Sequence, residues 1–258
     1  MPDALPAADD APLAILYRDD HLVAIHKPAG LLVHRTALDR HETRFAVQLL
    51  RDQIGQHVWP AHRLDRGTSG VLLFALDADT AGQLGRQFEA QTVAKRYVAV
   101  VRGHPPESGL IDHALSRQRD DCEWVDPRAE PAPQAARTAY RRLATIELPI
   151  AVDRYPTSRY ALLQVDPETG RKHQIRRHLK HISHPIIGDA TYGKGQHNRM
   201  FAAHFGCRRL LLASTDLWLD HPASGQRLHL HAAPAADFTA LLDRFGWCAA
   251  LQIQTAPL

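Results

Sequence analysis

Short apolar runs of the kind that form β-strands recur along most of the chain. Two of them lie in residues 13–34, where Asp19 and Asp20 separate the runs and a turn from Pro28 to Gly30 follows, so this segment predicts a hairpin that leads into a loop. Most connections favour antiparallel pairing. Further runs with strand character occupy residues 70–77, 95–103, 138–148, 158–166, 210–220 and 227–232.

A helical period appears in fewer places. Residues 43–54 repeat apolar side chains at helical spacing and end before Gly55, a residue typical of a helix stop. Residues 80–89 place Leu84 and Phe88 on one face. Strands dominate, and the helices are interspersed without regular β-α-β alternation, so we expect an α+β fold with a mixed, largely antiparallel central sheet flanked by helices. A last amphipathic helix is predicted from Phe238, Leu241, Leu242 and Phe245.

One further helical segment, residues 171–182, is strongly basic. Ile175, Leu179 and Ile182 form its apolar stripe, and no acidic residue occurs between positions 169 and 188. Such a helix predicts a surface that neutralises phosphates. Five cations lie off the stripe: Arg171, Lys172, Arg176, Arg177 and Lys180.

The composition suits a globular protein. A chain of 258 residues that is 45% hydrophobic can bury a substantial core in one domain or in two closely packed lobes, and it has no apolar run of about 18 residues. Residues 1–12 lack the pattern of a secretory signal and are predicted to be a disordered tail before a folded domain at 13–250. Residues 104–136 are polar and Pro-rich, which predicts a surface excursion. We expect a cytoplasmic protein without membrane contact.

Cysteines and histidines give little support to a metal centre. The three cysteines lie far apart, which argues against a disulfide framework and a zinc ribbon and favours a reducing compartment. His178, His181 and His184 follow one another at a spacing of three, but this spacing does not keep all three on one narrow helix face, and the surrounding cations repel a metal ion. We expect no metal and no organic cofactor. The cysteines are Cys122, Cys207 and Cys248.

The net charge of +3 is too small to indicate a nucleic-acid partner by itself, so the distribution of charge matters more. The segment HRLDRGTSG, residues 62–70, places Asp65 between Arg63 and Arg66. Taken alone, such an acid is most often a surface ion pair. The phosphate-binding loop, the dinucleotide fingerprint, the H-E-x-x-H zinc motif and the G-x-S-x-G hydrolase motif are all absent from the sequence, so the chemistry must come from other residues.

Four segments together resemble the RluA-type pseudouridine synthases. They occur in the same order and at similar separations as in that family, between about residues 13 and 233: HRLDRGTSG, KRY at 95–97, TGRKHQIRRHL at 169–179 and HPIIGDATYG at 184–193. Five strings further resemble the subgroup that modifies uridine 65 in the acceptor stem of tRNA: LVHRTALDR, RDQIGQHV, AHRLDR, RYPTSRY and HFGCRRL. We expect no S4-type RNA-binding domain before the catalytic part, unlike in many members that modify ribosomal RNA.

The resemblance implies a pseudouridine synthase fold, with two lobes and a catalytic cleft between them, and an isomerase that converts uridine to pseudouridine. The reaction breaks the bond from N1 to C1′ of the ribose, rotates the uracil and joins C5 to the same carbon. By resemblance, Asp65 is the catalytic carboxylate, Arg176 forms a salt bridge with it, and Tyr97 stacks beneath the target ring and is a candidate for removing the C5 proton. Attack of Asp65 on the sugar, attack on the pyrimidine and removal of a sugar proton all stay open.

The resemblance also assigns RNA contacts. Arg63 is expected to enter the RNA and fill the space left by the everted base, a role that suits a side chain able to stack. Gly67 and Gly70 are expected to let a phosphate or ribose approach the turn, and the hydroxyls of Thr68 and Ser69 to satisfy turn amides. We expect a monomer that binds RNA, specifically tRNA, without an obligate protein partner. The expected RNA-binding residues are Arg63, Arg66, Lys95, Arg171, Lys172, His173, Arg177 and Lys180.

Three alternatives remain beside a tRNA enzyme. The chain could modify ribosomal RNA within the same family, or bind RNA without catalysis, although a decayed enzyme would be free to lose the catalytic residues. A glycoside hydrolase would need a second carboxylate across the scissile bond from Asp65. Asp77, Asp79 and Asp189 show no marked pairing with Asp65 in the sequence.

Overall fold

The structure is a computed structural model, and it describes residues 11–35, 42–118 and 132–251. Most of the predicted tail at 1–12 and the middle of the excursion at 104–136 therefore lie outside the described residues. Among the residues that are described, no helix has both the length and the apolar character needed to cross a membrane.

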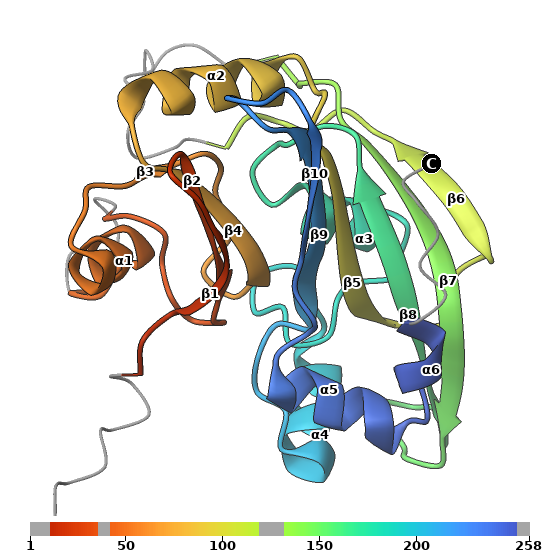
Figure 1. The fold of residues 1–258 in the computed structure, drawn as a ribbon. Helices are drawn as coiled ribbons and strands as arrows, with labels where there is room; N and C mark the ends of the chain where they lie inside the picture. Colours follow the sequence, from red (N-terminus) through yellow and green to blue (C-terminus); the bar gives the residue numbers. More distant parts are fainter. Residues whose placement is uncertain (1–10, 36–41, 119–131, 252–258) are drawn as a thin grey trace, which may run out of the picture.

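A single mixed sheet of ten strands organises the molecule (Figure 1). Its main path runs β1-β2-β4-β9-β5-β8-β7-β6, with β10 paired to β9 and β3 paired to β4. All pairs are antiparallel except β4 with β9, as the connections in the sequence predicted. The strands are β1 (Ala14–Arg18), β2 (Leu22–Lys27), β3 (Trp59–Pro60), β4 (Ser69–Ala75), β5 (Ala94–Arg102), β6 (Ser108–Asp112), β7 (Arg137–Leu148), β8 (Ser158–Pro167), β9 (Leu212–Asp220) and β10 (Arg227–His231).

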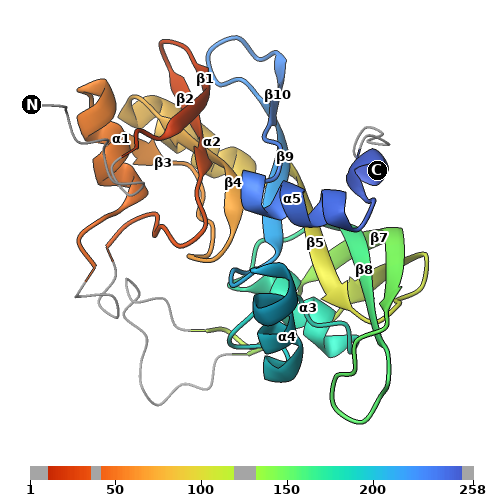
Figure 2. The same ribbon diagram turned by 90° about the horizontal axis from the view of Figure 1, so that it is seen from below.

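Helices cover the sheet at different places and divide the core into three clusters. One cluster lies between β2, β4 and α1, a second between β4, β9, β10 and α2, and the largest joins β5, β7, β8 and β9 to α3, α4 and α5. Figures 1 and 2 show α2 at one end of the sheet and α4 and α5 at the other. The helices are α1 (Ala46–Ile54), α2 (Ala78–Glu89), α3 (Gln174–His181), α4 (Gly195–Phe205), α5 (Ala236–Arg244) and α6 (Cys248–Leu251).

The ends of α1 and α2 follow from local chemistry. Gly55 ends α1 in the left-handed conformation, with its N–H bonded to the carbonyl of Arg51. The side chain of Asp77 caps α2 by accepting a hydrogen bond of 2.7 Å from the N–H of Thr80. Both predicted helices are confirmed, and the cap starts α2 two residues before the predicted residue 80.

The basic helix is shorter than predicted, because its first three residues form a turn instead. Gln174 binds this turn: its Oε1 accepts hydrogen bonds from the hydroxyl of Thr169 at 2.6 Å and from the N–H of Arg171 at 3.0 Å. His173 then takes a left-handed conformation, with φ of 55°. The predicted helix at 171–182 therefore begins at Gln174, and the two cations before it lie on a loop.

The turn after Asp65 packs closely against the start of β9. A Cβ on Gly70, where φ is 110°, would lie 1.9 Å from the carbonyl oxygen of Ser214 on β9, and a Cβ on Gly67 would lie 3.0 Å from the Cβ of Leu210. The hydroxyl of Ser69 accepts a hydrogen bond from Arg209, not from a turn amide. The glycines therefore let the turn pack against the start of β9, and the approach of a phosphate or ribose to the turn stays a prediction.

Candidate active site

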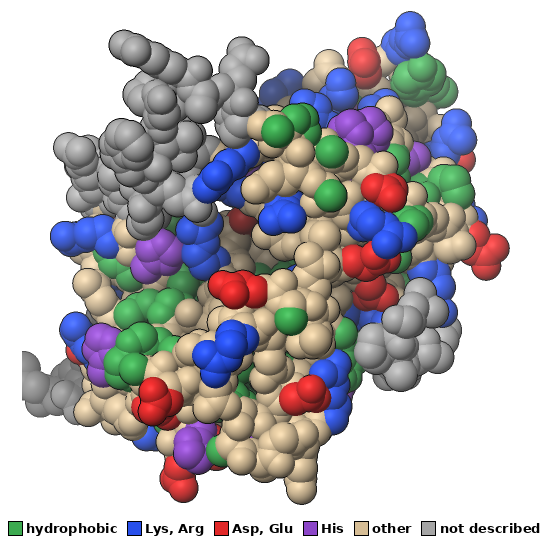
Figure 3. All heavy atoms as spheres, turned by 90° about the horizontal axis from the view of Figure 1, so that it is seen from above, with side chains coloured by type: hydrophobic (Ala, Val, Ile, Leu, Met, Phe, Trp, Pro, Cys, Tyr) green, Lys and Arg blue, Asp and Glu red, His purple; other side chains and the backbone are tan. Residues whose placement is uncertain are grey.

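A cleft of about 760 Å³ contains the predicted catalytic residues. One wall comes from the loop around Asp65, between β3 and β4, and the other from the turn that leads into α3, with Tyr97 of β5 between them. A view from the α2 end shows Lys and Arg side chains gathered around a hollow in the surface (Figure 3). The structure thus brings together segments that lie more than a hundred positions apart in the sequence.

Backbone contacts fix the loop that carries Asp65. The N–H of Gly30 donates to the carbonyl of Arg66 at 2.8 Å, and the N–H of Thr68 donates to the carbonyl of Asp65 at 3.0 Å. Lys27, which is buried, donates to the carbonyls of Pro28, Leu31 and Arg66. Burial lowers the pKa of Lys27 to about 7, because the charged ammonium is less stable away from water than the neutral amine.

Arg176 holds the carboxylate of Asp65 through one nitrogen and uses the other two elsewhere. Its Nη1 donates to Oδ2 of Asp65 at 3.0 Å. Its Nε and Nη2 donate to the two carboxylate oxygens of Asp189 at 2.7 and 2.9 Å, which is the bidentate geometry that a guanidinium favours. Asp189 in turn accepts from the backbone N–H groups of Thr191 and Tyr192, both at 2.9 Å. Backbone amides thus hold Asp189, Asp189 holds Arg176, and Arg176 holds Asp65.

The charges of Arg176 and Asp189 support each other and hold Asp65 in place. Burial opposes the charge on Arg176, but its contacts with Asp189 and Asp65 raise its pKa. Burial likewise opposes the charge on Asp189, but the guanidinium and the two amides lower its pKa. The guanidinium of Arg176 lies between the two carboxylates. Asp65, 23% of whose side chain is exposed, presents its carboxylate to the cleft.

His173 and Tyr192 complete the surroundings of Asp65. The Nε2 of His173 lies 3.8 Å from Oδ1 of Asp65, and its Nδ1 lies 3.0 Å from the hydroxyl of Tyr192. The ring of Tyr192 lies 5.0 Å from the guanidinium carbon of Arg176, a cation–π contact. Burial lowers the pKa of His173 although Asp65 opposes the shift, so the imidazole is neutral at pH 7.

Tyr97 presents a neutral phenol to the cleft. Tyr97 and Lys95 are two residues apart on β5, and both side chains line the cleft. Burial raises the pKa of Tyr97 to about 12, and the nearby charge of Asp65 adds to the shift, whereas a hydrogen bond with Ser214 opposes it. A phenol of this kind can stack and donate a hydrogen bond at pH 7, and it must first lose its own proton before it can accept another.

Six of the eight predicted RNA-binding residues line this cleft: Arg63, Arg66, Lys95, Arg171, Lys172 and His173. Arg63 is exposed at its rim. Arg177 and Lys180 are not among the lining residues of the described chain. Arg177 donates to the carbonyl and the hydroxyl of Ser116, and Lys180 lies 5.8 Å from the centre of the Tyr192 ring. Arg177 follows Arg176 directly in α3 and lies on another face of the helix, and Lys180 lies four residues beyond Arg176.

The three histidines considered as metal ligands point to different partners. His178 is buried, with Nδ1 at 2.9 Å from the hydroxyl of Thr138, while His181 stacks on His113 and His184 bonds the carbonyl of Arg102. They do not converge on a common point. The absence of a metal from this helix stays a prediction.

Asp189 is the main site residue that the sequence analysis did not assign. Its pairing with Asp65 is indirect, through Arg176, and 124 positions separate the two acids. A signal was present nonetheless: Asp189 and Tyr192 both lie in HPIIGDATYG, one of the four segments that carry the family resemblance. Asp189 faces Arg176 and not the open cleft, so it does not supply the second carboxylate of a glycoside hydrolase.

Comparisons with known proteins agree with this geometry. Residues 21–181 match the family described as RNA pseudouridylate synthase. The chain is 51% identical over 235 residues to the tRNA pseudouridine synthase C of Pectobacterium carotovorum subsp. carotovorum, covering 91% of this chain but only 62% of that protein. It is also 51% identical over 235 residues to the tRNA pseudouridine synthase C of Yersinia pestis, covering 91% of each.

A solved structure confirms the predicted fold. Human RNA Pseudouridylate Synthase Domain Containing 4 superimposes with a TM-score of 0.67 and 28% identity, over 90% of this chain and 93% of that one. The α+β class predicted from the strand and helix pattern is confirmed by this likeness and by the mixed, mostly antiparallel sheet.

Proposed function

The chain belongs to the RNA pseudouridylate synthase family, and from that premise we propose that it isomerises a uridine of tRNA to pseudouridine with Asp65 as the catalytic carboxylate. One observation carries the proposal: the carboxylate of Asp65 lies in a cleft with its charge oriented by Nη1 of Arg176 at 3.0 Å. An enzyme that opens a glycosidic bond without a cofactor needs an ionised acid in such a place.

The cleft suits an extruded nucleotide. Removal of a base from its stack costs a few kcal/mol, and the exposed guanidinium of Arg63, two residues before Asp65, can occupy the vacated space by stacking. Tyr97 offers a ring on which the target uracil can stack. The cations of the cleft neutralise phosphates of the flanking nucleotides, and all three chemical routes left open by the sequence use the same carboxylate oxygen.

The choice of tRNA rests on the relatives. Those from Pectobacterium carotovorum and Yersinia pestis are tRNA pseudouridine synthases at 51% identity, and the short strings noted in the sequence resemble the subgroup that modifies uridine 65. We therefore assign position 65 of tRNA as the target. The further parts of the assignment are a catalytic domain over residues 13–250, a cytoplasmic location and a monomer without an obligate protein partner.

Pseudouridine mapping in total RNA tests the target. Cells that lack the gene are compared with cells that carry it and with cells that carry the Asp65→Asn variant. Loss of one signal at position 65 of tRNA, restored only by the wild-type gene, supports the assignment. Loss within ribosomal RNA would move the protein to another branch of the family, and no loss at any site would contradict the activity itself.

The Asp65→Asn variant is the sharpest test of the chemistry. The amide has the same size but no charge, so we expect turnover on a tRNA transcript to fall by at least about 10⁴-fold while the tRNA dissociation constant stays within about threefold. Asp243→Asn, a change at an exposed aspartate of α5, is the matched control and should leave both values unchanged. Measurable multiple turnover by Asp65→Asn would falsify the assignment of the carboxylate.

A further inference from the structure

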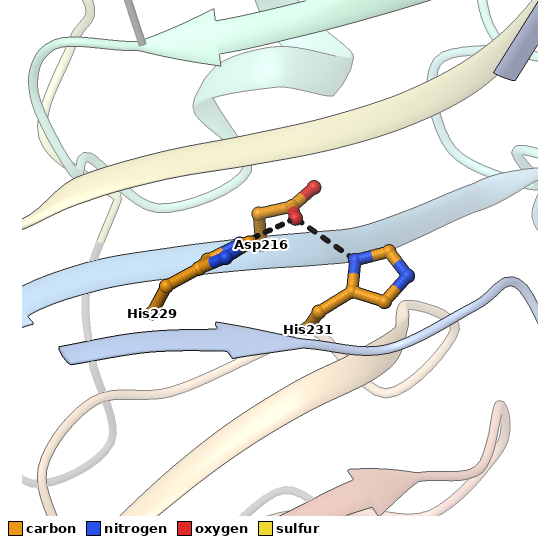
Figure 4. A group of neighbouring side chains, drawn as sticks. All are labelled: Asp216, His229 and His231. Atoms are coloured by element: carbon orange, nitrogen blue, oxygen red, sulfur yellow. Dashed lines mark hydrogen bonds and ion pairs between the residues drawn. The ribbon is translucent and has the colours of Figure 1, made fainter. Parts of the chain in front are cut away.

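A second cluster of titratable side chains lies outside the cleft, on the hairpin formed by β9 and β10. Asp216 comes from β9, and His229 and His231 come from β10. Figure 4 shows both imidazoles turned toward the same carboxylate. The Nε2 of His229 lies 2.8 Å from Oδ1 of Asp216, and the Nδ1 of His231 lies 2.9 Å from the same oxygen.

The register of the hairpin builds this cluster. His231 pairs directly with Asp216, and His229 pairs with Trp218, so the four residues are neighbours on one face of the two strands. The ring of His229 stacks on Trp218 with 4.6 Å between the ring centres and 6° between the planes. This stacking fixes the plane of the imidazole with its Nε2 directed at Asp216.

The carboxylate of Asp216 is short of partners for its burial. Its side chain is fully buried, whereas the two imidazoles are 47% and 48% exposed. Among the residues that the structure describes, Oδ2 of Asp216 has no hydrogen-bond partner. Both imidazoles face Oδ1 and neither contacts Oδ2, so an ion held by the two imidazoles would bind Oδ1 and offset part of the cost of burying the carboxylate charge.

We propose that Asp216, His229 and His231 form a binding site for a divalent transition-metal ion of the zinc class. Two imidazole nitrogens and one carboxylate oxygen are a common ligand set for Zn²⁺ with three protein ligands, and the three ligand atoms lie within 4.8 Å of one another. In a tetrahedral site with bonds of 2.0–2.2 Å, neighbouring ligand atoms are about 3.3 Å apart. The two separations between nitrogen and Oδ1, 2.8 and 2.9 Å, need to open by about half an ångström, and the two nitrogens lie within 4.8 Å of each other. The exposed side leaves the fourth position to water.

The ligand chemistry also selects among cations. Magnesium and calcium prefer oxygen ligands, so two imidazoles argue against them. Arg96 lies close to this cluster, with its guanidinium carbon 5.3 Å from the centre of the Trp218 ring. Its charge is matched by an ion pair with Asp166 at 2.9 Å, so it does not repel a metal ion as an unpaired cation would.

The position of the proposed metal site, outside the catalytic cleft, indicates a role in stability and not in the reaction. None of its residues lines the catalytic cleft in the described chain, and Asp216 joins the cleft only through the backbone, as the partner of Arg96 next to Tyr97. A bound ion would clamp β10 onto β9 and stabilise the fold without entering the reaction. The proposal therefore does not depend on the isomerase activity, and the expectation that the chemistry needs no metal is unaffected.

Titration with Co²⁺, followed by Zn²⁺ competition, tests the site in the full chain after treatment with a chelator. We expect one Co²⁺ per chain with the visible absorption of tetrahedral coordination, displaced by Zn²⁺. His229→Gln and His231→Gln should each weaken binding by at least about tenfold, because each removes one of three ligands. His204→Gln, which changes an exposed histidine of α4, is the matched control and should bind like the wild type.

Thermal unfolding gives an independent readout that does not use the activity. Excess Zn²⁺ should raise the Tm of the wild type and of His204→Gln by on the order of 5 °C, and should leave His231→Gln unchanged. Both ligand positions are half-exposed, so the variants should fold, which circular dichroism checks. Absence of a tetrahedral Co²⁺ spectrum, or binding that survives both ligand substitutions, would show that the cluster is only a hydrogen-bonded clamp and would overturn the proposal.

Discussion

Two buried arginines of this protein have nearly the same surroundings and different consequences. Arg96 on β5 makes a two-bond fork with Asp166, at 2.9 and 3.1 Å, and lies over Trp218. Arg176 on α3 makes a two-bond fork with Asp189, at 2.7 and 2.9 Å, and lies over Tyr192. Only Arg176 is among the residues that line the cleft in the described chain, and there its third nitrogen binds Asp65.

The difference shows what makes an ion pair functional in this molecule. A fork with one aspartate and a ring beneath it fixes a guanidinium equally well in both places. At Arg176 that rigidity is passed on to a second carboxylate, which is partly exposed and faces the substrate, so the pair with Asp189 orients a reacting group. The residue types around Arg96 and Arg176 do not distinguish the functional arginine from the structural one. The position of the third guanidinium nitrogen relative to the cleft distinguishes them.

Replacement of each arginine by lysine should separate the two roles. Lysine cannot bind two carboxylates in a planar fork. Arg176→Lys should lower turnover by about 10²–10³-fold, because Asp65 loses its orientation. Arg96→Lys should lower the free energy of unfolding by about 2–4 kcal/mol while turnover changes by less than about tenfold. Turnover on a tRNA transcript and urea denaturation measure the two effects. Equal losses of turnover in both variants would show that the two arginines do not differ in their role in catalysis.

The sequence predicted those elements whose local chemistry decides them. Helices α1 and α2 have a clear apolar period and ends marked by Gly55 and Asp77. It missed α4, which has no side-chain cap and only a weak apolar face, and it placed the start of α3 three residues early. That start depends on the tertiary bonds of Gln174 with the carbonyl of Arg137 and the hydroxyl of Thr138, which no local pattern reveals.

The site was predictable as far as the family segments reach. Asp65, Tyr97 and Arg176 lie in three of the four segments, and the structure brings all three to one cleft. The contact partners behind them were not predictable in the same way, because burial and backbone geometry decide them. Asp189 showed no pairing in the sequence, and nothing in the sequence revealed that Gly70 lies against the backbone of Ser214.

Acid should reveal two histidines that the folded chain keeps neutral. Burial lowers the pKa of His62 and of His197 to about 4. In the unfolded chain both titrate near 6.5, so between pH 6.5 and 4 the unfolded state binds more protons. Stability is therefore fully present above pH 6.5 and is lost as the pH falls toward 4, by up to about 3 kcal/mol for each histidine.

Urea denaturation at pH 7.0 and 4.5 measures this loss. His197→Gln should flatten the pH dependence, because it removes one of the two groups, whereas His204→Gln at an exposed position should leave the slope as it is. The arginines add no slope in this range. An identical slope in His197→Gln and the wild type would show that His197 takes up protons equally in both states.

The Tyr97→Phe variant tests the role of the phenol hydroxyl. It keeps the ring for stacking but removes the hydroxyl, whose pKa of about 12 keeps it protonated at pH 7. We expect tRNA affinity to be unchanged, turnover to fall by about 10–100-fold, and the reaction to stall after glycosidic cleavage, because the phenol oxygen can no longer take the C5 proton while it passes its own proton to solvent. Release of tritium from C5-labelled tRNA measures that step. Normal tritium release would exclude the hydroxyl from proton transfer.

Salt should separate the oriented pair from the cations that only neutralise phosphates. Arg171 and Lys172 line the cleft on the loop before α3, so the double alanine variant should weaken tRNA binding by about tenfold and lower the slope of log affinity against log salt by about 1–2. Arg177→Ala is the matched control, since Arg177 donates to Ser116 and is not among the described residues that line the cleft. Filter binding from 50 to 200 mM salt measures both quantities. If the double variant keeps the wild-type slope while Arg177→Ala lowers it, the RNA crosses the outer face of α3, and the loop before the helix is not the binding surface.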